Sequence, residues 1–297
     1  MRFGISLPQA GLAPEAFRNY VTRAEELGFD SAWTQEQVLG SKPHLSPLEV
    51  MTYAAAYTTR LRLGCSVFVS SLHSPAHLAK SISTVDQLSQ GRVEVGFGVG
   101  GRTRMLSAFG VSPDGLVSRF TEGVRLMKEC WTAPKIDFDG RFWQVHGTQM
   151  EPKPVQKPYP PIWFGGGHPN AVRRAVQYAD GFFGAGLSTT EDFAAQVKVL
   201  REELRGREFP IAKRVYVTVD DDPDRARQTM SDSLDDQYGL LGSQGKLLPI
   251  AVTGTPEDCV RGVRAVVAAG AELVLLSPLR NEHEQMERLA AEVIPNI

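Results

Sequence analysis

The sequence of 297 residues has few cysteines, little net charge and no long apolar run. Its three cysteines, Cys65, Cys130 and Cys259, are far apart, which argues for reduced thiols in a cytoplasmic protein. The net charge of −2 gives no electrostatic reason to expect a nucleic acid or a membrane surface as a partner. No apolar stretch approaches the roughly 20 residues that cross a bilayer.

Several catalytic signatures are also missing. No G-x-G-x-x-G follows the first strand, which argues against a Rossmann dinucleotide site. No G-x-S-x-G is present, so a hydrolase nucleophile elbow is excluded. His73 and His77 are four residues apart, but zinc needs a third ligand and the sequence suggests none nearby. We therefore expect no metal site.

The stretch from Leu61 to Gly101 predicts a strand, a helix and a parallel strand. Leu61–Val69 is apolar and rich in β-branched residues, and Val93–Val99 repeats that pattern. Ser74 and Pro75 between them are typical of a helix start. One helix face is predicted to be buried by apolar residues at helical spacing: Ala76, Ala79, Ile82, Val85 and Leu88.

The same alternation of strands and helices runs along the whole chain. It predicts eight strands, and this number over this length favours a closed (β/α)₈ barrel over an open doubly wound sheet. We expect a single domain over residues 1–297. A proline-rich insertion at about 133–161, with a hairpin of Ile136–Phe138 and Phe142–Gln144, interrupts the pattern, as does an irregular segment at about 242–254.

Two glycine runs follow predicted strands, at the ends where parallel α/β folds bind ligands. The first is Gly98-Val99-Gly100-Gly101, and the second, Gly165-Gly166-Gly167, leads through His168 into a helix. Each run is either a simple turn or part of a phosphate cradle, and their equivalent places favour the cradle. Arg102 and Arg104 follow the first run and either pair with phosphate or carboxylate or are simply solvated. Glu36, after the second strand, is a candidate acid or base or only a surface group.

Six sequence stretches together resemble the bacterial luciferase-like monooxygenase family, in the branch that uses the deazaflavin coenzyme F420. They are FGISLPQ, FDSAWTQEQ, LGCSV, SPAHLAK, QLSQGRVEVGFGVGG and PIWFGGGHPNAVRRAVQYADGF. The resemblance implies a barrel whose C-terminal mouth holds the cofactor ring, and a homodimer. It implies a non-prolyl cis peptide at Ser66–Val67 against the ring. It also implies a phosphate site at Gly98–Gly100 and Gly165–His168.

Two positions depart from the family pattern. Many members have an acidic residue and then histidine where this chain has Glu36 and Gln37. Glutamine cannot take a proton at neutral pH, so Glu36 or the substrate itself would have to serve as the base. Sugar-phosphate dehydrogenases of the family have glutamate where this chain has Gly101, so oxidation of glucose 6-phosphate is not expected.

The resemblance implies an F420-dependent oxidoreductase that transfers a hydride between C5 of the deazaflavin and a small organic substrate, acting as a reductase. One alternative is an FMN-dependent monooxygenase that uses reduced flavin and oxygen. An alternative of another class is a cofactor-binding protein with little turnover, because the usual base is missing. Candidates for lining the mouth are Trp33, His44, Phe68, His73 and Trp163.

Overall fold

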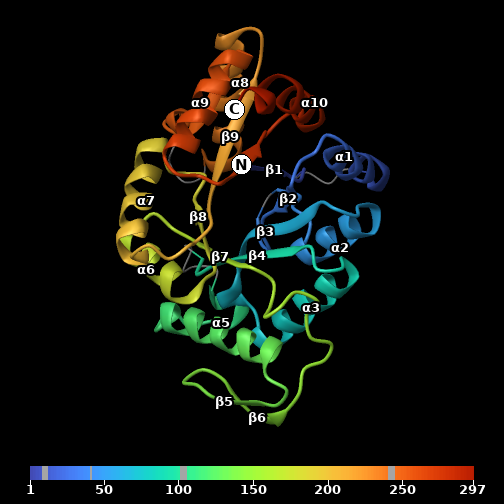
Figure 1. Ribbon diagram of the computed structural model, residues 1–297, viewed down its shortest axis with the longest axis vertical. Helices are drawn as coiled ribbons and strands as arrows, with labels where there is room; N and C mark the ends of the chain where they lie inside the picture. The colour runs from blue at the N-terminus through green and yellow to red at the C-terminus, as the bar shows by residue number, and fades with distance from the viewer. Residues whose placement is uncertain (9–12, 41, 101–105, 240–244) are drawn as a thin grey trace.

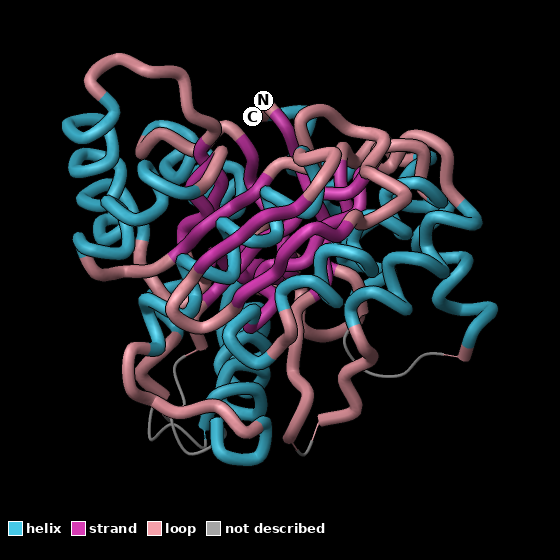
Figure 2. Tube along the Cα trace, turned by 90° about the horizontal axis from the view of Figure 1, so that it is seen from below, coloured by secondary structure: helices cyan, strands magenta, loops and turns pink. Residues whose placement is uncertain are grey.

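The computed structural model describes residues 1–8, 13–40, 42–100, 106–239 and 245–297. Within these ranges, eight parallel strands form a closed ring with helices packed around the outside (Figures 1 and 2). Pairing of the first strand with the last closes the ring, which confirms the predicted (β/α)₈ barrel. In order around the ring the strands are β1 (Arg2–Ser6), β2 (Ser31–Thr34), β3 (Arg62–Val69), β4 (Val93–Gly98), β7 (Ile162–Gly165), β8 (Gly181–Gly184), β9 (Ile211–Val219) and β11 (Leu273–Ser277).

The helices begin at residues suited to a helix N-terminus. Proline stands in the first turn of many of them, where its missing N–H costs no hydrogen bond. Thr189 with Asp192, and Thr255 with Asp258, form capping boxes. No described helix is both long and apolar enough to cross a bilayer. The helices are α1 (Pro14–Glu26), α2 (Pro47–Tyr57), α3 (Pro75–Leu88), α5 (Leu116–Thr132), α6 (Pro169–Tyr178), α7 (Thr190–Leu204), α8 (Pro223–Tyr238), α9 (Pro256–Ala268) and α10 (Glu282–Arg288).

Aromatic side chains fill the barrel interior. Trp33 and Trp163 meet edge to face, with ring centroids 6.3 Å apart, and Phe183 packs against both. Phe68 belongs to the main hydrophobic core. Trp33, Phe68 and Trp163 are therefore core residues rather than the mouth-lining residues that we expected, because each is at most 3% exposed.

A buried carboxylate sits at the N-terminal end of the barrel. The side chain of Glu94, near the start of β4, is 2% exposed. It accepts hydrogen bonds from Arg2 at 2.6 Å, from the indole of Trp163 at 2.8 Å, and from Arg62. The charge at this end is therefore matched by two guanidinium groups, which makes it part of the structural closure of the barrel.

Three local predictions were wrong. Ala76 and Leu88 of α3 are exposed, because steps of three residues turn by about 300° and a run of five such positions drifts off one face. Strand β9 begins at Ile211 rather than Val215. A short strand, β10 (Ala251–Gly254), pairs with β9 inside the segment expected to be irregular.

The insertion contains the predicted hairpin, with its second strand two residues later than expected. It consists of β5 (Ile136–Asp139) and β6 (Gln144–Thr148), which lie beyond α5 in Figure 1. The Glu122 carboxylate of α5 accepts the backbone N–H groups of Arg141, Phe142 and Trp143. The guanidinium of Arg119 lies 4.4 Å from the Trp143 ring centre, so α5 holds the connection between β5 and β6.

Candidate functional site

A cavity of about 300 Å³ opens at the carboxyl ends of the barrel strands. Such ends are where ligands bind in this fold, and the volume falls at the small end of the usual range for ligand pockets. The lining is mostly apolar and glycine-rich, with a few polar side chains. It consists of Gln35, Ser66, Val67, Phe97, Gly98, Gly165, Gly166, Phe183, Gly184, Ala185, Gly186, Leu187, Arg214, Tyr216 and Tyr238. Ser66, Val67, Gly98, Gly165 and Gly166 are among the binding residues predicted from the sequence.

The peptide bond between Ser66 and Val67 is cis, at the position that the family resemblance indicates. The pairing of β3 with β4 shifts register between Cys65 and Phe68, so the chain bulges at this point. A Cβ atom at Gly98 would lie 2.6 Å from a methyl carbon of Val67. Gly98 is therefore required by the bulge itself, whether or not a ligand is bound.

Arg214 is the main polar group of the cavity that sequence reasoning missed. It lies on β9 and is 5% exposed. Its guanidinium donates to the Gln35 side chain at 2.9 Å, and to the carbonyl and hydroxyl oxygens of Ser66 at 3.1 and 2.7 Å. All three partners are neutral. The sequence signal was the pair of charges, Lys213 and Arg214, inside an otherwise apolar strand.

Lys213 points away from the cavity, toward α7, and is 2% exposed. Its ammonium group donates to the Ser188 carbonyl at 2.8 Å, to the Ser188 hydroxyl at 3.0 Å and to the Ala185 carbonyl. Burial, with a smaller contribution from Arg214, lowers the pKa of Lys213 to about 7. Lys213 thus holds the loop after β8, which forms one wall of the cavity.

The two predicted catalytic residues, Glu36 and Gln37, have different surroundings. The Glu36 carboxylate accepts the N–H of Val69 at 2.7 Å and lies 2.8 Å from Nε2 of His73. The Glu36 side chain is 4% exposed and that of His73 is 29% exposed. The Gln37 side chain instead folds against Gly40 in its own loop. Glu36 therefore orients His73, and the two form an acid–base pair joining the ends of β2 and β3.

The second glycine run is constrained partly by the chain itself. A Cβ at Gly165 would lie 2.5 Å from the Phe183 carbonyl, and Gly166 has a φ of +141°. Gly167 is free of such constraints, since its Cβ would meet only the Gln196 side chain, at 3.8 Å. The His168 ring caps α6 by accepting the N–H of Asn170 at 3.1 Å.

Room for an anion remains at this loop. Among the described residues, the backbone N–H groups of Gly166, Gly167 and His168 donate to no acceptor. In the first run, Gly100 has a φ of +82°, and the Val99 carbonyl accepts the Ser71 hydroxyl at 2.6 Å. Arg102, like Gly101 and Arg104, lies outside the described residues.

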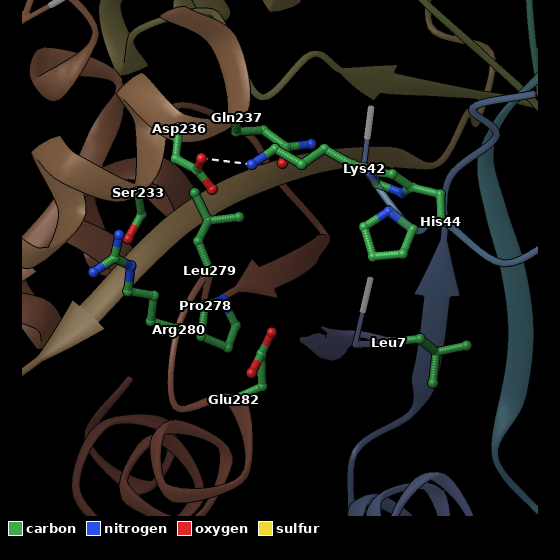
Figure 3. A pocket seen from close by; sticks show the side chains of 11 residues that line it. Leu7, Lys42, His44, Ser233, Asp236, Gln237, Pro278, Leu279, Arg280 and Glu282 are labelled. Carbon is green, nitrogen blue, oxygen red and sulfur yellow. Dashed lines mark hydrogen bonds and ion pairs between the residues drawn. The ribbon is translucent and has the colours of Figure 1, made fainter. Parts of the chain in front are cut away.

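A second cavity, of about 220 Å³, lies between the ends of β1 and β11, the loop after β2, and α8 (Figure 3). Lys42 of the loop and Asp236 of α8 form an ion pair at its edge. His44 lines this cavity, and burial, with a smaller contribution from Lys42, lowers its pKa. Of the side chains expected at the mouth, His44 therefore lines a cavity distinct from the one that contains Ser66 and Val67.

The fold and the cavity define a (β/α)₈ barrel whose ligand site lies at the carboxyl ends of its strands. Residues 1–273 match the luciferase-like monooxygenase family. The chain belongs to this family and is an oxidoreductase.

Known relatives and structures agree with this assignment. An F420-dependent glucose-6-phosphate dehydrogenase of Kineococcus radiotolerans is 26% identical across 99% of this chain and 96% of its own length. An FMNH₂-dependent dimethylsulfone monooxygenase of Pseudomonas putida is 25% identical across 92% of this chain and 85% of its own. The structure of an F420-dependent secondary alcohol dehydrogenase superposes with a TM-score of 0.85 at 19% identity, covering 99% of this chain and 98% of its own, which supports the fold.

Proposed function

We propose that the protein binds a reduced deazaflavin, coenzyme F420, at the cavity beside Ser66 and Val67 and uses it to reduce a small organic substrate. Membership of the luciferase-like family and the F420-dependent relative support this cofactor. The observation that carries the proposal is the mouth cavity itself, which joins the cis peptide, the glycine loop and a buried guanidinium in one site. When bound, the deazaflavin supplies hydride chemistry at C5.

The residues present fit such a cofactor. The apolar floor of the cavity suits a flat ring, with Val67 and Gly98 on one side of the cavity and Ala185 and Gly186 on another. The N–H groups of Gly166–His168 suit a phosphate further along the cofactor. We propose that Arg102, together with Val99 and Gly100, completes the site for the anionic tail.

We propose that Glu36 and His73 manage the proton that accompanies reduction. A histidine held by a carboxylate through one ring nitrogen can carry a proton on the other. Glu36 acts through His73, because its own oxygens are already bound to His73 and to the N–H of Val69. Gln37 cannot exchange protons, so it takes no part in this transfer.

Glucose 6-phosphate is not the substrate that we propose. The relative from Kineococcus radiotolerans is named for that sugar phosphate. This chain has Gly101 where sugar-phosphate dehydrogenases of the family have glutamate, so a carboxylate is missing from its sequence at that point.

The decisive experiment is equilibrium titration of the purified protein with F420 and with FMN, followed by turnover assays. F420 should bind more tightly, and the reduced coenzyme should be oxidised when an enone or imine is added. We also propose a homodimer, as the family resemblance implies, and sedimentation velocity on the same sample tests it.

Two other outcomes would contradict the proposal. Tight binding of FMN with oxygen consumption would assign the protein to the monooxygenases, the second candidate, which the Pseudomonas putida relative favours. Binding of F420 without turnover on any enone, imine or alcohol would indicate a cofactor-binding protein.

A further inference from the structure

The charge on Arg214 lacks a counter-charge in the described structure. Its guanidinium lines the mouth cavity and is 5% exposed, yet its hydrogen-bond partners are a side-chain amide, a hydroxyl and a carbonyl. Among the described residues, none of the hydrogen-bond acceptors of Arg214 is a carboxylate. Burying a cation without an anion is costly, so a protein that retains one at a ligand cavity gains when an anion enters.

None of the titratable side chains around Arg214 forms an ion pair with it in the described structure, although the charges of Glu36 and Arg214 both influence the pKa of the Cys65 thiol. Glu36 follows Gln35 but is bound to the N–H of Val69 and to His73. The Cys65 thiol on β3 is buried, and burial raises its pKa, so it is neutral at pH 7. Lys213 adds positive charge. Tyr216 and Tyr238, from β9 and α8, share a hydrogen bond between their hydroxyls, and burial raises the pKa of Tyr238.

Arg214 also has donors to spare. A guanidinium offers five N–H groups, and three hydrogen bonds are formed in the structure. Two of those bonds hold Ser66, so the group is fixed beside the cis peptide. Its position is set before a ligand arrives, which is the arrangement that stabilises a developing charge most effectively.

We propose that Arg214 makes the cavity prefer the reduced cofactor ring over the oxidised ring, by stabilising the additional negative charge of the reduced form. This inference rests on the proposed function. Hydride addition brings two electrons and one proton, so the reduced ring carries one more negative charge than the oxidised ring unless a second proton follows. A positive charge near the ring favours that state.

The test compares the dissociation constants of oxidised and reduced F420, measured anaerobically by fluorescence and absorbance titration. The parent protein, Arg214→Gln and Arg214→Lys are compared. We expect the parent to bind the reduced form more tightly, and Arg214→Gln to lower that preference about tenfold or more, as loss of a charged hydrogen bond predicts. Arg214→Lys should keep most of the preference, because it keeps the charge. Equal weakening of both forms in a folded Arg214→Gln variant would overturn the inference.

A measurement on the parent alone covers the case in which the glutamine variant does not fold. The bound reduced ring should stay deprotonated to a lower pH than the free reduced coenzyme, as followed by absorbance. Protonation of the bound and free forms at the same pH would overturn the inference. Failure of the parent to bind F420 or FMN in either redox state would instead remove the proposed function, and this inference with it.

Discussion

Both ends of the barrel contain a buried charge. At one end it is paired with opposite charges of the chain, and at the other it is not. At the N-terminal end, Glu94 is surrounded by Arg2, Arg62 and the Trp163 indole, so its charge is balanced within the chain. At the mouth, Arg214 donates its hydrogen bonds to neutral groups only. A charge balanced by its own chain contributes to the fold, whereas an unbalanced one beside a cavity is retained for a ligand.

The largest expected effect is on stability at the N-terminal end. Glu94→Leu should lower the free energy of unfolding by about 3 kcal/mol, because it leaves two guanidinium groups and an indole N–H without their acceptor. Arg214→Met is the matched change at the mouth, and should cost less or even stabilise, since it removes an unbalanced buried charge. Urea denaturation of both variants checks this. Equal losses at the two ends would contradict the comparison.

A large effect on turnover is expected for Glu36, which follows Gln35 of the cavity lining. Glu36→Gln can keep hydrogen bonds to the N–H of Val69 and to His73 while losing the charge, so the fold should be preserved. Turnover should fall about 100-fold, the lower end of what general acid–base catalysis contributes. His73→Gln should give a similar loss, without an additional loss in the double variant. Full activity of either single variant would exclude the pair from proton transfer.

A smaller effect is expected from Lys213, on the pH dependence of the free energy of unfolding. Its pKa is lowered from 10.5 to about 7 in the folded protein, so between these values the unfolded chain binds a proton that the folded chain has released. The free energy of unfolding should therefore rise with pH above about 7, relative to that of Lys213→Met, by at most about 1.4 kcal/mol per pH unit. Urea unfolding at pH 6, 7, 8 and 9 measures the difference. A difference that stays constant over this range would show that the lysine is not neutralised.

The smallest expected effect is on cofactor affinity at Gly167. It distinguishes whether the second glycine run is a simple turn or a phosphate cradle. Gly167→Ala should leave stability nearly unchanged, because its Cβ would have space, but it narrows the approach to the free N–H groups. Affinity for the phosphate-bearing cofactor should fall several-fold. Gly166→Ala is the contrasting variant, and should lose stability because its φ of +141° is unfavourable for alanine and its Cβ would lie 2.7 Å from that of Ala171. Unchanged cofactor affinity in Gly167→Ala would indicate that the second glycine run is only a turn.

The sequence was sufficient for the barrel and for part of the mouth. Apolar runs between helix-start signals located the eight barrel strands, and the glycines at strand ends located part of the cavity wall. Arg214 could not be found this way. Two adjacent charged residues end an apolar run in sequence. The predicted strand therefore began at Val215 and left out Arg214. In space the strand continues, because β9 pairs with β8 and β11 through this point.

The partners of Glu36 were also beyond the sequence. Position after a strand showed that the carboxylate would lie near the mouth, but His73 is 37 residues away. The direct pairing of β2 with β3 brings the carboxyl ends of these two strands together. In the same way, Trp33 and Trp163 occur near strand ends in sequence, yet their side chains fill the barrel interior.

The ion pair between Lys42 and Asp236, at the edge of the second cavity, is only weakly stabilising. Its side chains are 32% and 62% exposed, and such pairs contribute at most about 1 kcal/mol. An equilibrium of that size leaves the pair open at least about one sixth of the time. The pair therefore does not lock the loop after β2 to α8.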